Sequence, residues 1–307
     1  MENYSDKLKQ ILSATSWSQE TLTPKLGMSF VSLNAWVNQK SEPRDAAKQK
    51  IDLVFAEVMG SDAVNPEDLK ITKKKALAKR CTAKKIAENQ KLLEKITTSL
   101  TYHSNGTEGS TMTEQDVEAV IYENQTLKNR TQKEQREAIN HQTALYYLLS
   151  ELTEKGEDFT FTPELILATH LRMMNGVISD AGFWRNHSVR VTGSRVARAN
   201  YLKIPELINN WCNQANSETM DKINLLATTH AEFEKIHPFS DGNGRTGRLL
   251  LFALALKLEL TPPILYKERR EAYYKYLELL NEREITDPLE LFIANSIIEI
   301  AEEIEGT

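Results

Sequence analysis

The sequence predicts a mainly α-helical fold with a single β-hairpin, and three observations support this prediction. Apolar residues recur at helical spacing through most of the chain, between helix caps and stops. Leu249–Leu256 is apolar on every side, which is typical of a buried helix. Ser188–Thr192 instead alternates with period two and precedes Gly193-Ser194, which predicts a hairpin. The expected fold is a helical core with a β-hairpin flap and a small helical domain at the N-terminus.

Three segments are expected along the chain. Residues 1–60 are predicted to form the small helical domain, residues 61–95 a basic helical connector and residues 96–307 the main domain. Pro66 and the cluster Gly60-Ser61-Asp62 mark the first boundary.

Charge is distributed unevenly between the two ends of the chain. Residues 1–95 contain 17 Lys and Arg against 12 Asp and Glu, and the remainder contains 21 against 31. Most of the positive excess lies in Lys70–Lys85, which has no acidic residue. We interpret this run first as a solvated helical face or linker, and second as a contact for phosphate.

Other features bound the class of protein. The first residues are polar and acidic, and no apolar run reaches the length of about 18 residues that a membrane helix needs, so a cytoplasmic protein without a membrane partner is expected. Cys81 and Cys212 are far apart, which favours a reducing compartment and gives no zinc pattern. The absence of a Gly-x-x-x-x-Gly-Lys-(Ser/Thr) sequence excludes a P-loop as the phosphate binder.

One stretch of the sequence concentrates groups that bind anions. Residues 237–248 read His-Pro-Phe-Ser-Asp-Gly-Asn-Gly-Arg-Thr-Gly-Arg and directly precede the apolar run. The glycines are therefore expected at the N-terminus of the buried helix, where unpaired backbone N–H groups and the helix dipole attract phosphate. Glycine also lets the backbone approach a pyrophosphate closely, and the three positions are Gly242, Gly244 and Gly247.

The polar side chains of this stretch suit phosphate chemistry. Asp241 is a hard oxygen ligand for Mg2+ that arrives on nucleotide phosphates. Asn243 can donate to a phosphate oxygen, and Arg245 and Arg248, on one helical face, can form bidentate bonds to phosphate. His237 can accept the proton of an attacking hydroxyl. A glycine-rich turn with a core histidine is the alternative, but twelve ordered positions favour the phosphate site.

This stretch resembles the signature of the Fic-domain family, His-Pro-Phe-x-(Asp/Glu)-Gly-Asn-Gly-Arg-x-x-Arg, with every fixed position present. Most characterised members transfer AMP from ATP to a Ser, Thr or Tyr hydroxyl of a target protein. The resemblance implies that His237 is the general base, that Asp241 holds Mg2+, and that Arg245 and Arg248 clamp the outer phosphates. A phosphorylating branch of the family carries Lys where this chain has Gly244, so the glycine favours nucleotidyl transfer.

Two flanking segments extend the resemblance. Glu268–Leu277 resembles the helix that lines the adenine pocket of the family, with Tyr274 and Asn281 at base-contacting positions. Gly182-Phe-Trp184-Arg185 and the following Ser188–Arg195 resemble the hairpin flap over the active site of the family. The edge of this flap is expected to hold a segment of the target protein by strand addition.

A further motif predicts inhibition. Ser104-x-x-x-Glu108-Gly109, within the segment 100–120, is similar to the inhibitory motif (Ser/Thr)-x-x-x-Glu-(Gly/Asn) of Fic proteins that carry it before the core. The resemblance implies that Glu108 pairs with Arg248 and fills the γ-phosphate site, so that ATP binds unproductively. The alternative is a helix end followed by a new helix that Thr113 caps.

The first sixty residues resemble the helix-turn-helix of phage-repressor-like DNA-binding domains, through Trp17-Ser-Gln-Glu-Thr-Leu22, Leu26-Gly27-Met28-Ser29, Trp36 and Pro43. Gly27 is expected to stop one helix and Ser29 to cap the next. The resemblance implies a recognition helix over about Phe30–Asn38 that presents polar and aromatic side chains to a major groove. These side chains are Ser29, Phe30, Ser32 and Asn34. A helical module that binds protein, or no partner, is the alternative.

The sequence thus predicts a protein adenylyltransferase that moves AMP from ATP to a protein hydroxyl, uses Mg2+ and is autoinhibited by Glu108. The alternatives are a transcriptional regulator with a nucleotide-sensing Fic domain, and a Fic enzyme that transfers another nucleotide or phosphocholine or removes AMP. The expected partners are a target protein at Ser188–Arg195, DNA at residues 1–60 and a second copy of the chain in a homodimer. The identity of the target, the DNA site and the signal that relieves inhibition stay open.

Overall fold

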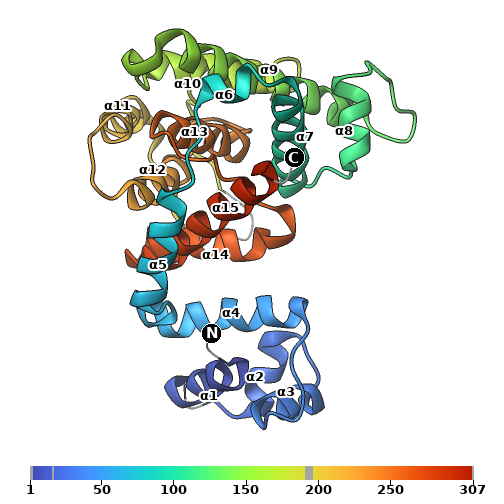
Figure 1. Ribbon diagram of the computed structural model, residues 1–307, viewed down its shortest axis with the longest axis vertical. Helices are drawn as coiled ribbons and strands as arrows, with labels where there is room; N and C mark the ends of the chain where they lie inside the picture. The colour runs from blue at the N-terminus through green and yellow to red at the C-terminus, as the bar shows by residue number, and fades with distance from the viewer. Residues whose placement is uncertain (1–2, 16, 191–195, 306–307) are drawn as a thin grey trace.

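A computed structural model describes residues 3–15, 17–190 and 196–305, and these residues are mainly helical, which confirms the predicted fold class at that level (Figure 1). The first four helices and a 3-10 turn form a separate group at the N-terminal end: α1 (Tyr4–Thr15), α2 (Gln19–Leu26), α3 (Phe30–Val37), α4 (Asp45–Met59) and η1 (Gly60–Ala63).

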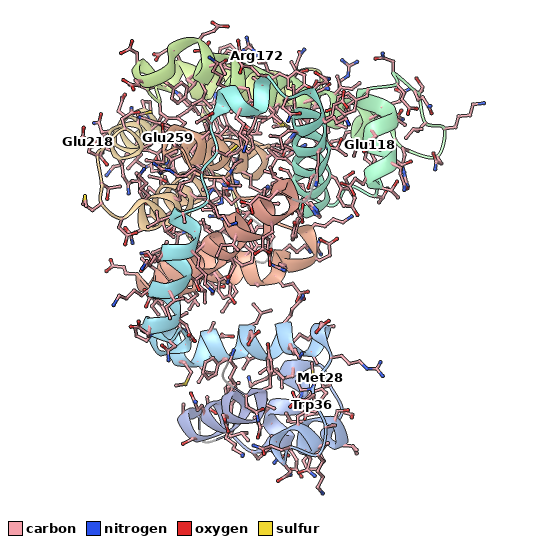
Figure 2. The ribbon with its side chains drawn as sticks, viewed as in Figure 1. Met28, Trp36, Glu118, Arg172, Glu218 and Glu259 are labelled. Carbon is pink, nitrogen blue, oxygen red and sulfur yellow. The ribbon has the colours of Figure 1, made fainter. Side chains whose placement is uncertain are left out.

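The helices of this N-terminal group begin and end where the capping residues predict. Gly27 adopts the left-handed conformation with φ 62° and ends α2, as expected of a residue without Cβ. The Ser29 hydroxyl accepts a hydrogen bond from the Ser32 amide and begins α3. The group has its own apolar core, which includes Leu8, Leu22, Leu33, Ile51 and Phe55. Figure 2 shows Met28 and Trp36 in this group, below α4. The resemblance to a DNA-binding module stays a prediction.

The remaining helices form a larger lobe around a main core, with a smaller apolar cluster at α8. They are α5 (Pro66–Leu77), α6 (Ala83–Ala87), α7 (Gln90–Thr107), α8 (Glu114–Ile121), α9 (Gln132–Lys155), η2 (Gly156–Asp158), α10 (Pro163–Met174), η3 (Tyr201–Lys203), α11 (Ile204–Ala215), α12 (Lys222–Ile236), α13 (Asn243–Lys257), η4 (Lys267–Arg269), α14 (Arg270–Arg283) and α15 (Asp287–Glu305). None of the helices in the described residues has the length and apolarity needed to span a bilayer.

Helix α13 is the centre of the lobe. Its apolar run Leu249–Leu256 is buried on every side, as predicted, and α7, α9, α10 and α12 all pack against it. Because the apolar run is enclosed by helices, the polar N-terminal turn of α13 is fixed in place by the core. The geometry of the site described below depends on this anchoring.

Part of the basic run Lys70–Lys85 pairs with acidic residues of the lobe. Helix α5 packs along α15, and Lys73 Nζ lies 2.5 Å from an Asp221 oxygen and 2.6 Å from a Glu290 oxygen. Lys79 pairs with Glu305 in the same way, at 3.0 Å. These ion pairs dock two lysines of the run on the lobe, whereas Lys70, Lys74 and Lys75 are exposed, as expected of a solvated helical face. A contact with phosphate stays a prediction.

The described residues do not show the predicted flap hairpin as strands. Residues 191–195, which include the expected turn, lie outside the described residues, and neither 186–190 nor 196–199 forms a strand. In the part of the chain that the structure describes, the one isolated β-bridge joins Arg80 and Leu260. The carbonyls of His187 and Ala199, which a hairpin ladder could use, accept hydrogen bonds from the Arg185 guanidinium. This pairing is a physical reason for the absence of a ladder at these positions.

Helix α4 connects the N-terminal group to the larger lobe by lying against α14 (Figure 1). The Lys275 ammonium of α14 lies 3.4 Å from a Glu57 carboxylate oxygen. The Arg283 guanidinium of α14 donates to the Glu57 carbonyl at 3.0 Å. The N-terminal group therefore contacts the helix predicted to line an adenine pocket.

Candidate active site

A cleft of about 700 Å³ opens between the ends of α7, α12, α13 and α14. It brings together three segments that the sequence singled out separately: His237 and Gly244 of the signature, Glu108 and Gly109 of the second motif, and Tyr274 and Asn281 of α14. These residues are far apart in sequence. The packing of α13 in the core is what places them around one cavity.

His237 lies at the end of α12 and lines the cleft, with one ring nitrogen next to a backbone carbonyl. Its φ is 52°, and its amide donates to the Phe233 carbonyl, which ends the helix. Its Nδ1 lies 3.3 Å from the Glu234 carbonyl, an acceptor only, so the Nδ1–H form is favoured and Nε2 keeps its lone pair. Burial lowers the pKa of His237 to about 4, with Arg198 adding to this effect. The imidazole is therefore a neutral base at pH 7.

Glycine is required at two positions in the turn before and within α13. Gly242 has φ 78°, and a Cβ there would lie 2.6 Å from the Met174 sulfur. A Cβ at Gly244 would overlap a Glu108 carboxylate oxygen and would lie 3.0 Å from Arg248 Nη1. The Glu108 carboxylate therefore sits directly over the first turn of α13, the part of a helix that attracts anions.

Arg248 binds the C-terminal end of α7. Its Nη2 lies 2.7 Å from Glu108 Oε1 and 2.9 Å from the Ser104 carbonyl, and its Nε donates to the Ser104 hydroxyl at 3.0 Å. The arginine is 2% exposed. Burial alone would lower the pKa of Arg248, but the Glu108 charge raises it above its usual range. One of these hydrogen bonds joins the guanidinium to the Glu108 carboxylate, and the other two fix the guanidinium to Ser104.

The two signature arginines have different partners, although they lie on one helical face. Arg245 Nη1 lies 2.8 Å from Glu137 Oε1 of α9, and its Nη2 lies 3.5 Å from Asp241 Oδ1. Asp241 Oδ1 also accepts from the Gly242 amide at 2.6 Å, while its side chain stays 51% exposed. In this arrangement Arg245 supports the loop, and only Arg248 faces the carboxylate of Glu108.

The Asn243 side chain stabilises the turn between His237 and α13. Its side-chain oxygen accepts from the Phe239 amide at 2.8 Å, and its side-chain nitrogen donates to the Phe239 carbonyl at 2.9 Å. The residue is 2% exposed. These two bonds close the turn between His237 and α13, and the expected donation from Asn243 to phosphate stays a prediction.

Several residues that shape the site were not identified from the sequence. His170 of α10 stacks on Phe239 with ring centroids 3.5 Å apart and bonds to the Asp241 carbonyl at 3.0 Å. Glu234 lines the cleft, and burial raises its pKa to about 7. Glu137 forms an ion pair with Arg245. Arg198 donates a hydrogen bond to the Glu234 carbonyl. Only Glu234 had a local signal, because it lies three residues before His237 and so near the same helix end.

Comparisons with known proteins show similarity in the region of the signature. Residues 160–255 match the Fic/DOC family. The protein adenylyltransferase Fic of Drosophila virilis is 33% identical over 196 residues, which are 63% of this chain and 40% of that protein. The protein of the same name from Drosophila melanogaster is 32% identical over 196 residues, 63% of this chain and 39% of that protein. The chain thus spans about 40% of the length of these curated relatives.

Solved structures share the fold. A fragment of Fic-1 from C. elegans superposes with a TM-score of 0.68 at 20% identity, over 96% of this chain and 97% of that chain. A Fic domain containing signaling protein from Bacteroides thetaiotaomicron gives a TM-score of 0.62 at 19% identity, over 77% of this chain and 93% of that chain. Together with the family match and the geometry of the cleft, these similarities show that the chain contains a Fic domain with homology to protein adenylyltransferase Fic.

Proposed function

We propose that this protein is a protein adenylyltransferase, which moves AMP from ATP to a Ser, Thr or Tyr hydroxyl of a target protein. The observation that carries the proposal is the position of His237, a neutral base, at the wall of a cleft that also contains the first turn of α13 and the predicted adenine helix. The similarity to adenylyltransferases over 63% of the chain supports the same reaction.

The reaction can be written from these groups. The target hydroxyl oxygen attacks the α-phosphorus of ATP and forms a new P–O bond. The bond between the α-phosphorus and the oxygen that bridges to the β-phosphate breaks, and pyrophosphate leaves with that electron pair. His237 Nε2 takes the hydroxyl proton, while its Nδ1–H stays bonded to the Glu234 carbonyl. The first turn of α13 holds the phosphates, which positions the α-phosphorus for attack.

Asp241 is suited to hold Mg2+ in this reaction. Its side chain is 51% exposed next to the first turn of α13. Among the described residues, no group of three or more His, Cys, Asp or Glu side chains could hold a metal ion, so Asp241 fits an ion whose other ligands are phosphate oxygens and water. When bound, Mg2+ neutralises charge on the phosphates and the leaving pyrophosphate.

The α14 side of the cleft fits the base of the nucleotide. Tyr274 is 45% exposed and lines the cleft with Asn281, whose amide also donates to the Ala231 carbonyl at 3.3 Å. An aromatic ring and an amide are the groups that stack on a purine and bond to its edge. We assign the adenine to this side, opposite the phosphates at α13.

Inhibition by Glu108 is part of the proposal. The carboxylate and a γ-phosphate would both bind Arg248 and the first turn of α13, so they compete for one place. Two anions there repel each other. ATP then binds with its phosphates displaced from Arg248, and the α-phosphorus is not aligned with the attacking hydroxyl.

The target protein is proposed to dock at Ser188–Arg195 by strand addition to the hairpin that the sequence predicts there. Residues 191–195 lie outside the described residues, so the support comes from the flanks. Val196 and Arg198 line the cleft next to His237, so the flank after residue 195 lies at the candidate base. A target segment at this edge would bring its hydroxyl close to the base.

Labelled ATP tests the proposal. Purified protein incubated with α-labelled ATP should become covalently labelled, whereas γ-labelled ATP should leave it unlabelled, because Gly244 favours attack on the α-phosphorus. His237→Ala should abolish the label, and Lys235→Ala on the preceding turn should keep it. Covalent transfer of the γ-label would contradict adenylyl transfer and would indicate a phosphorylating enzyme.

The N-terminal group is proposed to bind DNA through α3. The support is the short turn between α2 and α3 and the exposure of Phe30 on the first turn of α3. The protein should then bind its own promoter region with an affinity that falls as salt rises. Substitutions Ser32→Ala and Asn34→Ala should relax the sequence preference. Binding that ignores sequence would contradict a recognition helix at this position.

A further inference from the structure

Arg185 connects the end of α12 to the segments that flank the predicted flap. It follows Gly182, which turns the chain after α10 with φ 81°. Arg185 is 2% exposed, and its backbone amide donates to the Pro238 carbonyl at 2.9 Å. The main chain of Arg185 therefore contacts the segment between His237 and α13.

The guanidinium of Arg185 binds backbone carbonyls from three segments. Its Nε donates to the His237 carbonyl at 2.7 Å, and its Nη2 lies 3.3 Å from the Ile236 carbonyl. Its Nη1 donates to the His187 carbonyl at 2.7 Å, and its Nη2 also donates to the Ala199 carbonyl at 2.6 Å. One side chain thus joins the end of α12 to both flanks of residues 191–195.

The partners of Arg185 are unusual for a buried cation. Burial lowers the pKa of Arg185, and in the described residues no carboxylate offsets this effect. A buried charge without a counterion is costly to keep, even when hydrogen bonds satisfy its donors. A neutral side chain that filled the same space would avoid this cost. The charge therefore points to a role beyond packing.

We propose that Arg185 is a positioning residue for His237, holding its backbone in the left-handed conformation and placing a positive charge next to its carbonyl. The inference rests on the proposed function of His237 as the base. With φ 52°, His237 is held in a conformation that residues with a Cβ rarely adopt, and the bond to its carbonyl stabilises it there. The same guanidinium fixes both flanks of the predicted docking segment relative to the base.

The charge of Arg185 acts on His237 together with other groups around the ring. Arg198 and Arg185 both oppose protonation of His237, while the Glu234 carbonyl and the Glu108 carboxylate favour it. Removing the charge of Arg185 should therefore make protonation of His237 easier. A residue with a purely structural role would alter folding without moving this equilibrium.

Two variants and one control test the inference in the full-length chain. Arg185→Met removes the charge and the donors, and Arg185→Lys keeps the charge but cannot bind four carbonyls. Arg172→Met is the control, because Arg172 lies on the outer face of α10, over the Tyr147 ring (Figure 2). Three quantities are measured: kcat and KM for AMP transfer, the pKa of His237 by NMR titration, and the temperature of thermal unfolding. The NMR signal of His237 is assigned by its loss in His237→Ala.

Arg185→Met should lower kcat by about 100-fold or more, with KM for ATP changed by less than about 3-fold, because the base is misplaced and the nucleotide site is intact. The pKa of His237 should rise. Arg185→Lys should lower kcat while the pKa of His237 stays low, and this variant carries the test if Arg185→Met does not fold. Folded Arg185 variants with the wild-type kcat, or a His237 pKa that stays the same in Arg185→Met, would overturn the inference. A Glu108→Gly protein that transfers no AMP contradicts the proposed function instead, and the NMR titration still tests Arg185 because it does not depend on activity.

Discussion

Glu108 Oε1 lies 2.7 Å from Arg248 Nη2 and covers the first turn of α13, where a Cβ at Gly244 would overlap it. A carboxylate that binds an arginine and a helix N-terminus occupies the position that a phosphate group would take. The two ligands cannot share this position, because both are anions. If the proposed function holds, the contact links the conformation of α7 to the way a nucleotide binds.

Replacing Glu108 should raise AMP transfer. Glu108→Gly removes the carboxylate and frees Arg248 to bind the γ-phosphate, so both target modification and self-modification should rise, by about 10-fold or more if the contact contributes at least about 1.4 kcal/mol. Glu108→Gln keeps the size of the side chain but removes its charge. Its rate of AMP transfer should lie between the rates of wild type and Glu108→Gly. Incorporation of α-labelled ATP measures all three proteins. Equal rates for wild type and Glu108→Gly would show that the contact is not inhibitory.

A double variant separates the release of inhibition at Glu108 from the binding of phosphate by Arg248. Arg248→Ala should be inactive alone and also in combination with Glu108→Gly, because the same arginine binds phosphate in the productive complex. Glu118→Gly on α8 is a matched control, since Glu118 lies away from the cleft (Figure 2). A double variant as active as Glu108→Gly would remove Arg248 from the phosphate site.

The sequence predicted the parts of the site that are local and could not predict how they meet. The helix beginning after Gly242, the stop at Gly27 and the cap at Ser29 follow from residues that are neighbours in the chain. Contacts such as that between Arg245 and Glu137 join α13 to α9 across more than a hundred residues, and no local pattern marks them. The sequence also treated Arg245 and Arg248 as equivalent, although the packing of α7 and α9 gives them different carboxylates.

The pH dependence of transfer should report the neutral state of His237. Burial lowers the pKa of His237 to about 4, so the base loses activity only as pH falls through that value, well below the 6.5 of a histidine in water. In Glu108→Gly the pH at which activity is lost in acid should not rise. The reason is that the Glu108 charge favours protonation of His237, and the substitution removes it. kcat/KM measured from pH 4 to 8, with circular dichroism to verify folding, tests this. An acid limb near pH 6.5 would contradict a buried neutral base.

Buried histidines should make the protein less stable in acid. Burial lowers the pKa of both His141 and His230 to about 3 from a usual 6.5. Between these values the unfolded chain binds more protons, so the free energy of unfolding rises with pH and its contribution is complete above about 6.5. Each histidine gives a slope of about 1.4 kcal/mol per pH unit. His230→Gln, which can still bond to the Tyr273 hydroxyl, should remove one such slope in urea titrations from pH 4 to 6.5.

Glu234 gives the opposite sign and provides the control for this measurement. Burial raises the pKa of Glu234 to about 7 from a usual 4.5, so in this range the folded state binds the extra proton. Its contribution to stability is present below pH 4.5 and is lost as pH rises through 7. Glu234→Gln should therefore steepen the rise in stability between pH 4.5 and 6.5, whereas His230→Gln flattens it. Identical slopes in the two variants would show that neither group is buried as described.

The N-terminal group should influence the nucleotide site through Glu57 and Lys275. Lys275 lines the cleft and lies 3.4 Å from Glu57 of α4, so the ion pair fixes part of the cleft wall. The Glu57 side chain is 46% exposed, so the pair is worth no more than about 1 kcal/mol. Glu57→Lys should accordingly weaken ATP binding by about 2- to 5-fold with kcat unchanged, and Glu57→Lys with Lys275→Glu should restore it.

Glu20→Lys, on the exposed side of α2, is the matched control and should have no effect. ATP affinity measured by calorimetry decides the matter: equal affinity in wild type and Glu57→Lys would mean that the N-terminal group rests on α14 without affecting the cleft.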